Sequence, residues 1–232
     1  MTQAEVLAWL KRNGTQRTVD GMARYGLPSD RAFGVTVAAM RAQAKKIGKD
    51  HALAAELWKS GWYEARMMAS LVDDPALVTA RQMDAWAKDF EDWGICDTAC
   101  FHLFSRNPLA WGVARRWAKS PREFVKRGAF ALMASFVLRD KAAPDAQFLA
   151  LLPLIEKGAA DERNLVKKGV SWALRSIGKK NKTLNTAAVA LSRRLAAADN
   201  AAPRWVGKDA LRELAGAAVQ ARLAASGKRR AR

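Results

Sequence analysis

The chain consists of short helix-forming segments from end to end, and this rhythm constrains its fold more than any other feature. Ala, Leu, Lys, Arg and Met, which favour helices, dominate the composition. No stretch alternates β-branched or aromatic residues between turn signals in the way that strands require. Helix start signals recur instead: Thr2 and Glu5 form a capping box, and Asp50 and Thr79 are further N-cap candidates. We therefore predict an all-α fold of roughly a dozen helices.

The spacing of these helices predicts a repeat architecture. They are joined by short linkers and pair with a period of about forty residues, the range of HEAT and armadillo repeats. Short antiparallel helices with short connections stack into solenoids. The sequence therefore predicts a HEAT-like or armadillo-type helical-repeat superhelix (an α-solenoid), and an irregular all-α globule is the alternative. We expect one repeat domain over residues 1–226 and a basic, disordered tail over residues 227–232.

Three further boundary predictions follow from the same signals. Ser29 and Asp30 can cap the helix that comes after them, and one helix is expected over residues 93–104. Asp161 is expected to cap a helix over residues 164–177, which stops at a glycine.

The positive charge is concentrated in the C-terminal part of the chain. The 232 residues include 40 Lys and Arg against 22 Asp and Glu, a net charge of +18. Residues 161–232 hold 17 basic and 5 acidic residues, a net of +12, and the first 160 residues carry the remaining +6. A strongly basic folded domain favours a polyanionic partner. Nucleic acid is the commonest such partner, and an anionic membrane surface is the alternative.

Composition also excludes several classes of protein. The chain is 50% hydrophobic, enough for a sizeable core, yet it has no run of eighteen apolar residues that could span a membrane. Its only cysteines, Cys96 and Cys100, cannot build a disulfide framework or a four-cysteine zinc site. With His51 and His102 as the only histidines and no glycine-rich phosphate loop, we expect neither a metal site nor a nucleotide cofactor. The N-terminus has no secretory signal pattern, so we expect a cytoplasmic protein.

The hexapeptide at residues 92–97 is the most informative short segment. Trp93 and Asp97 are four residues apart and share one helix face, which places a carboxylate beside an indole. The alternative is that Trp93 belongs to the core and Asp97 is solvated or caps a helix. Cys96 and Cys100 occupy another stripe of the same helix, where we expect them to be small core residues.

Two further segments combine cations with aromatic or apolar residues. Lys168, Trp172 and Arg175 form a cation–aromatic–cation stripe that suits a backbone phosphate and a stacked base. Its alternative is an amphipathic helix with a buried indole and solvated charges. Arg127 lies where a basic stretch becomes apolar, as an arginine projecting from a helix end into a groove would, although Lys126 or Arg122 could take that role.

Together these motifs resemble the AlkD-type DNA alkylation-repair glycosylases. The resemblance rests on Trp-x-x-x-Asp at residues 93–97, on a basic pair before small and apolar residues at 126–130, and on Val-Lys-Lys-Gly-x-x-Trp-x-Leu-Arg at 166–175. Residues 62–66 resemble that family's Glu-x-Arg helix, and residues 208–214 resemble its C-terminal helix. The likeness extends over about residues 53–214. Its specific parts are the Trp–Asp pair and the Lys-Lys-Gly-x-x-Trp segment.

The resemblance implies a HEAT-like superhelix whose basic concave face holds duplex DNA, and hydrolysis of the N-glycosidic bond of N3- or N7-alkylated purines. Asp97 would be the catalytic carboxylate, and Trp93 and Trp172 would be aromatic walls against the damaged nucleotide. Arg127 would hold a backbone phosphate near the lesion. Further DNA contacts are expected from Lys126, Lys167, Lys168, Arg175, Lys179, Lys180 and Lys182.

Three functions remain open at this point. The first is an alkylpurine DNA glycosylase that acts as a monomer, without a cofactor or a membrane, in association with the nucleoid. The second is a DNA-binding HEAT-repeat protein that has the fold but not the chemistry. The third is a protein-interaction solenoid with an acidic partner. This function predicts that the protein shows no salt-sensitive binding to duplex DNA.

Overall fold

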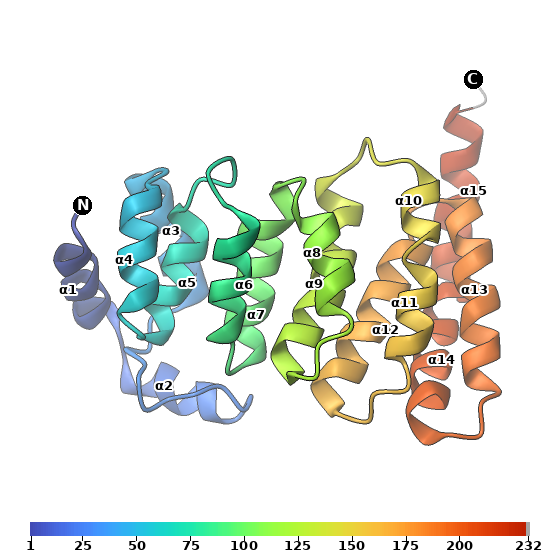
Figure 1. Cartoon of the computed structure of the whole chain (residues 1–232), viewed down its shortest axis with the longest axis horizontal. Helices are drawn as coiled ribbons and strands as arrows, with labels where there is room; N and C mark the ends of the chain where they lie inside the picture. The colour runs from blue at the N-terminus through green and yellow to red at the C-terminus, as the bar shows by residue number, and fades with distance from the viewer. Residues whose placement is uncertain (231–232) are drawn as a thin grey trace. The chain divides into compact units, whose positions relative to one another are not determined.

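A computed structural model describes the backbone of residues 1–230 and the side chains of residues 1–225. Every regular element in these residues is a helix, as the sequence predicts (Figure 1). The chain divides into two compact units, an N-terminal unit (Met1–Leu109) and a C-terminal unit that begins at Ala110. No helix within the described residues is long and apolar enough to cross a bilayer. The prediction of a single repeat domain over residues 1–226 stays a prediction.

The N-terminal unit is built on α5, which packs against α3, α4 and α7. The predicted capping box of Thr2 and Glu5 is confirmed at α1, as are the N-caps Asp50 at α4 and Thr79 at α6. The indoles of Trp58 and Trp86 stack in the core with their ring centroids 4.0 Å apart. Its helices are α1 (Gln3–Asn13), α2 (Gln16–Ala23), α3 (Val37–Ile47), α4 (His51–Lys59), α5 (Tyr63–Val72), α6 (Ala80–Lys88) and α7 (Trp93–Thr98).

The helix expected over residues 93–104 is shorter than predicted. The α-helix α7 ends at Thr98 and is followed by a π-helical segment, Ala99–Leu103, and a 3-10 turn, Phe104–Arg106. A π-helix widens the turn by one residue, and such segments occur frequently at functional sites. Cys96 and Cys100 are fully buried, as expected of core residues.

The predicted cap at Ser29 and Asp30 is wrong, because α3 begins only at Val37 with Thr36 as its N-cap. The reason is the buried carboxylate of Glu64 on α5. It accepts hydrogen bonds from the backbone N–H groups of Phe33, Gly34 and Val35, at 2.9, 2.7 and 3.2 Å. This contact across the fold holds residues 33–35 out of the helix and supplies the hydrogen bonds that a buried carboxylate needs.

The C-terminal unit places α9, α12 and α14 side by side, with α8 packed on α9 and α13 packed on α14 (Figure 1). α14 approaches α13 so closely at Gly207 that a side chain there would overlap the α13 backbone. The helices are α8 (Ala110–Trp117), α9 (Glu123–Arg139), α10 (Asp145–Leu149), α11 (Leu152–Gly158), α12 (Asn164–Gly178), α13 (Lys182–Ala196), α14 (Ala201–Leu214) and α15 (Ala217–Arg230).

Two predictions for this unit need correction. Asp161 does not cap α12, whose N-cap residue is Arg163; its carboxylate instead binds the side chains of Arg163 and Lys126. Two nearby cations therefore outcompete the helix amides for this carboxylate. The tail expected to be disordered over residues 227–232 belongs to α15 as far as Arg230, and residues 231–232 lie outside the described residues.

Candidate functional site

The first part of the candidate site is α7, a short helix that carries Trp93 and Asp97 on one turn. Both side chains are half-buried, so each presents part of its surface to solvent. The indole N–H of Trp93 donates a hydrogen bond to the backbone carbonyl of Tyr25, at 3.0 Å. The edge of this indole is therefore bound to the segment that follows α2. The predicted placement of an indole and a carboxylate on one helix turn is present in α7.

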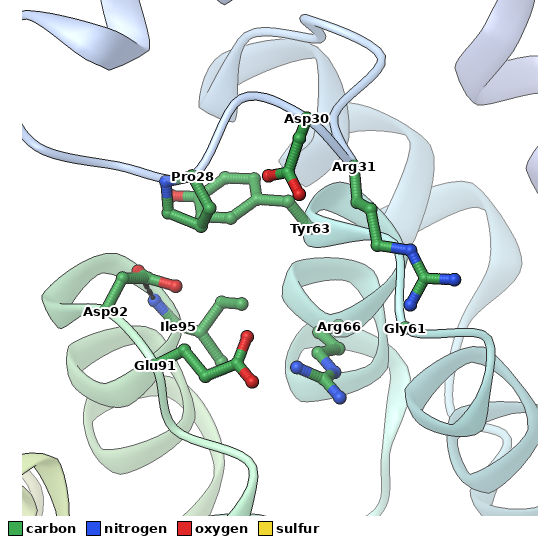
Figure 2. Close-up of a pocket in the computed structure, with 9 residues that line it drawn as sticks. All are labelled: Pro28, Asp30, Arg31, Gly61, Tyr63, Arg66, Glu91, Asp92 and Ile95. Carbon is green, nitrogen blue, oxygen red and sulfur yellow. Dashed lines mark hydrogen bonds between the residues drawn. The ribbon is translucent and has the colours of Figure 1, made fainter.

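Beside α7 lies a polar cavity of about 100 Å³, between the start of α7, α5 and the segment that precedes α3 (Figure 2). It contains side chains of both charges, with Asp30 and Arg31 on one side and Arg66 and Glu91 on the other. The complete lining is Pro28, Asp30, Arg31, Gly61, Tyr63, Arg66, Glu91, Asp92 and Ile95.

Asp92 joins this cavity to α7. It is the N-cap residue of α7, and one of its carboxylate oxygens accepts a hydrogen bond from the backbone N–H of Ile95 at 2.9 Å. Its side chain is buried, with a residue exposure of 1%, and its Oδ2 has no hydrogen-bond partner among the described residues. Burial raises the pKa of Asp92 to about 6; backbone N–H groups oppose this shift, and the nearby charge of Asp97 adds to it. The carboxyl group that caps the candidate helix therefore changes charge close to neutral pH.

Tyr63 and Gly94 fix the distance between α5 and α7. A Cβ at position 94 would overlap the hydroxyl oxygen of Tyr63, so only glycine permits this approach. Burial raises the pKa of Tyr63 well above its usual value, and Asp92 and Glu64 raise it further. The Tyr63 hydroxyl is therefore neutral at physiological pH, and it lies close against the start of α7.

In the C-terminal unit, Arg127 lies buried between α9 and α12, with 7% of its surface exposed. Its Nη1 donates a hydrogen bond to the carbonyl oxygen of Leu165 at 2.7 Å, and its side chain lies against Gly169. The sequence placed Arg127 at a helix end projecting into a groove. The structure places it on α9, inside the contact with α12, which is the helix that carries Lys168 and Trp172.

Three of the expected DNA-binding cations are already paired with carboxylates. The Lys126 ammonium lies 2.8 Å from Asp161. Glu213 binds both Arg175 and Lys179, each at 2.7 Å. Because their charges are partly neutralised, these side chains attract phosphate less strongly than isolated cations would.

The remaining expected contacts have different environments. Lys168 is exposed and has no carboxylate partner within the described side chains. The Lys167 ammonium lies 5.1 Å from the ring centroid of Trp205, and that of Lys180 lies 4.6 Å from Phe148. Trp172 is half-buried on α12, which also carries Lys167 and Lys168.

The candidate residues are divided between the two units. Trp93 and Asp97 belong to the N-terminal unit, and Arg127, Trp172 and the basic residues belong to the C-terminal unit.

Sequence reasoning singled out Asp30 as a cap and Arg66 as part of the Glu-x-Arg segment, but it gave Asp92 no role and did not predict that these polar residues line one cavity. An aspartate three positions before the Ile95 amide is a recognisable N-cap signal, which could have identified Asp92. Glu91 carries no such signal, and only the tertiary fold brings it together with Arg66. Within the side chains of residues 1–225, no group of three or more His, Cys, Asp or Glu residues is arranged to hold a metal ion.

Comparison with known proteins gives two informative matches. The family model described as "DNA alkylation repair enzyme" matches residues 6–214. A structure described as "a new family of proteins related to the HEAT-like repeat DNA glycosylases with affinity for branched DNA structures" is 22% identical. It covers 90% of this chain and 94% of its own, with a TM-score of 0.75, and this confirms the predicted HEAT-like helical-repeat fold.

Two other comparisons add less. A designed armadillo repeat protein in complex with a (KR)4 peptide is 12% identical over 91% of this chain and 92% of its own, with a TM-score of 0.42. None of the curated proteins matches this chain.

Proposed function

Because the chain belongs to the family of DNA alkylation repair enzymes, we propose that it is a DNA glycosylase that excises N3- or N7-alkylated purines from duplex DNA. The observation that carries this proposal is the position of Trp93 and Asp97 on one half-buried turn of α7. The fold supplies the support, since α7 is capped by Asp92 and held against α5.

The chemistry needs little more than a well-placed carboxylate. An alkyl group on N3 or N7 makes the purine cationic, so the leaving base is already activated. As the N-glycosidic bond breaks, positive charge develops on the deoxyribose. A carboxylate beside C1′ stabilises that charge, and in a site shielded from water this is worth roughly 3–4 kcal/mol. In our proposal Asp97 has this role and orients the attacking water, while the electron-rich face of Trp93 attracts the polarised sugar.

DNA would be held by the C-terminal unit, mainly through contacts that do not read sequence. Lys167, Lys168 and Lys180 have no carboxylate partner within the described side chains, and the half-buried indole of Trp172 is the aromatic side chain that we propose for the nucleotide contact in this unit. Phosphate contacts position a protein on DNA without specifying bases, which suits an enzyme that must act at any damaged site. We propose a monomer that works on the nucleoid in the cytoplasm.

The test of the proposal is the variant Asp97→Asn. We expect release of 7-methylguanine from methylated duplex DNA to fall at least tenfold, with DNA affinity nearly intact, because the amide keeps the shape but loses the charge. The matched control is Asp20→Asn on α2, an exposed aspartate outside the site. Wild-type rates in Asp97→Asn would contradict the catalytic role of Asp97.

A second candidate is a DNA-binding protein of the same fold without base-excision activity. It is favoured by the similar structure whose family is described as having affinity for branched DNA. This candidate predicts that the wild-type protein releases no alkylated base and binds a three-way or four-way junction more tightly than a linear duplex of equal length. If duplex binding proves insensitive to salt, an acidic protein partner becomes the better explanation.

A further inference from the structure

The proposed chemistry uses Asp97 and gives no role to the charge of Asp92, which stands at the start of the same helix. With 1% of its surface exposed, Asp92 is the most deeply buried ionisable side chain of the polar cavity beside α7 (Figure 2). A buried carboxylate lowers the stability of a protein unless hydrogen bonds or an opposite charge compensate it. Its presence at this position therefore requires an explanation.

The cap on α7 explains only one of the two oxygens of this carboxylate. Oδ1 of Asp92 accepts the hydrogen bond from the backbone N–H of Ile95 at 2.9 Å, which caps the start of α7. Oδ2 has no hydrogen-bond partner in the part of the chain that the structure describes. Asparagine and serine cap helices about as well as aspartate does. The cap therefore requires an oxygen acceptor but no negative charge.

Arg66, the cation of α5 that lines the cavity, does not bind this second oxygen. Its Nη1 donates to the carbonyl oxygen of Asp89 at 3.2 Å, and its guanidinium carbon lies 5.5 Å from the ring centroid of Trp58. Its Nε is buried and has no hydrogen-bond partner among the described residues. Arg66 therefore acts on Asp92 through space, without a hydrogen bond to Oδ2, and part of the carboxylate charge remains available to other groups.

The ionisable groups around Asp92 come from three segments. They are Asp30 and Arg31 before α3, Tyr63 and Arg66 on α5, and Glu91 and Asp97 on either side of Asp92 in the chain. Burial is the main cause that raises the pKa of Asp92 to about 6, and the charge of Asp97 raises it further. Because electrostatic coupling is mutual, an ionised Asp92 also repels the charge of Asp97.

Two like charges in one part of a site favour a cation beside them. In the proposed reaction the deoxyribose becomes positive as its base departs, and each ionised carboxylate nearby stabilises that charge. The attraction falls only with the inverse of the distance, and burial keeps water from screening it. A buried carboxylate at the start of α7 therefore acts on charge that develops beside Asp97.

We propose that Asp92 is a positioning residue for base excision by this protein. Its Oδ1 orients the first turn of α7, which presents Trp93 and Asp97, and its Oδ2 adds negative charge to that of Asp97 as the deoxyribose becomes cationic. This inference rests on the proposed function, because it concerns the chemistry of the same site. A residue that served only to cap α7 would stabilise the protein more without its charge.

The experiment compares the rates at which the full-length wild type and Asp92→Asn release 7-methylguanine from saturating methylated duplex DNA, between pH 5 and pH 8. Asparagine keeps the cap and removes the charge. At pH 5 Asp92 is largely protonated, so the two rates should agree within about twofold. As the pH rises through the Asp92 pKa of about 6, the wild-type rate should come to exceed that of the variant by about threefold to tenfold. Asp97 is present in both proteins, so the ratio of rates isolates Asp92.

The matched control is Glu91→Gln, which removes one negative charge from the adjacent, exposed residue of the same cavity. Water screens an exposed carboxylate far more than a buried one, so the ratio of wild-type to Glu91→Gln rates should stay constant within about twofold over this pH range. Asp92→Ser retains a cap through a different neutral side chain and should reproduce the pH dependence of Asp92→Asn.

A measurement that needs no activity tests the coupling itself. NMR titration of the aspartate carboxyl carbons follows the ionisation of Asp92 in the full-length protein, and Asp92→Asn identifies its signal. The variant Asp97→Asn should lower the midpoint of this titration, because the charge of Asp97 raises the pKa of Asp92 in the wild type. An unchanged midpoint would overturn the electrostatic link between the two carboxyl groups.

Two kinetic results would also overturn the proposal. One is a rate ratio of wild type to Asp92→Asn that is the same at every pH, which would make Asp92 a structural cap alone, and the other is equal rates at pH 7.5. If the wild type releases no 7-methylguanine, the glycosylase proposal fails and the role of Asp92 in excision fails with it. Base release by the wild type with a constant rate ratio refutes only the role of Asp92.

Discussion

The two units of this protein differ sharply in charge. Residues 1–109 hold 14 Lys and Arg against 13 Asp and Glu, a net of +1, whereas residues 110–232 hold 26 against 9, a net of +17. The proposed catalytic carboxylate lies in the nearly neutral unit, and the proposed DNA contacts lie in the basic one. Catalysis by a carboxylate and attraction of phosphate require opposite electrostatic environments. A carboxylate among many cations would be neutralised by them, while phosphate attraction grows with each added cation.

The same contrast appears in one carboxyl group from each unit. Asp92 in the N-terminal unit has an oxygen without a partner within the described residues, and burial raises its pKa to about 6. Asp161 in the C-terminal unit binds Arg163 and Lys126, and the hydrogen bonds from Arg163 are the main cause of its strongly lowered pKa. One unit therefore keeps a carboxyl group that resists ionisation, and the other surrounds its carboxylate with cations.

The largest expected effect concerns DNA affinity. Each unit contains an adjacent lysine pair, Lys167 and Lys168 on α12 and Lys45 and Lys46 on α3. Replacing the α12 pair by glutamine should weaken duplex binding roughly tenfold to a hundredfold near 0.1 M salt, and should reduce the log–log salt slope by up to about 2, because two phosphate contacts are lost. Fluorescence anisotropy over a salt series measures both quantities.

The matched control is the same double replacement at Lys45 and Lys46. Both lysines are exposed, and their replacement by glutamine removes the same total charge. It should leave affinity within about threefold, since only long-range attraction changes. Equal losses in the two double variants would show that net charge, and not the basic unit, governs binding.

The next effect is on stability in the C-terminal unit. Asp161→Asn should lower the free energy of unfolding by about 2 kcal/mol at pH 7, because Arg163 and Lys126 lose a charged acceptor. The folded-state pKa of Asp161 is depressed, so its contribution is present above about pH 4 and is lost as pH falls below that value. Urea denaturation at pH 7 and pH 3 should show the difference between wild type and variant shrinking at pH 3. If the free energies of unfolding of wild type and Asp161→Asn differ by the same amount at pH 7 and pH 3, the ion pairs of Asp161 do not cause the difference.

The smallest effect is in the N-terminal unit and has the opposite sign. The folded-state pKa of Asp92 is raised, so its favourable contribution is present below about pH 4 and is lost as pH rises towards 6. Asp92→Asn keeps the cap on α7 without a charge to bury. It should therefore raise the free energy of unfolding by about 1 kcal/mol at pH 7.5 and have almost no effect at pH 4.

Asp92→Ala is the companion variant, because it removes the cap as well as the charge and should be less stable than Asp92→Asn at every pH. Urea denaturation over this range distinguishes the two. A gain for Asp92→Asn that is independent of pH would contradict ionisation of Asp92 as its cause.

Local signals in the sequence predicted much of the fold. Thr2, Asp50 and Thr79 begin helices as expected, since a side-chain cap needs only neighbouring backbone amides. The helical-repeat class also followed from spacing alone. The prediction at Asp30 failed because the distant carboxylate of Glu64 binds the backbone of residues 33–35 and delays the start of the helix. The prediction at Asp161 failed because the side chains of the nearby Arg163 and the distant Lys126 bind its carboxylate.

The candidate site divides in the same way. The shared turn of Trp93 and Asp97 is a local property of helix geometry, so four-residue spacing was enough to find it. The burial of Arg127 against α12 and the pairing of Arg175 and Lys179 with Glu213 depend on helix packing. A sequence shows that such residues are cations but not which carboxylates or carbonyls they meet.

The helices, the repeat fold, the family and the uneven distribution of charge could all be predicted from the amino-acid sequence, because caps, periodicity and composition act over short distances along the chain. The three-dimensional packing of the helices sets which charged side chains pair within the protein and which stay available to a ligand. It buried Asp92 without a full set of partners, and it gathered Trp172, Leu138 and Arg222 around one pocket. The reason is that burial and electrostatic pairing depend on distances in space, which packing sets between residues far apart in the chain.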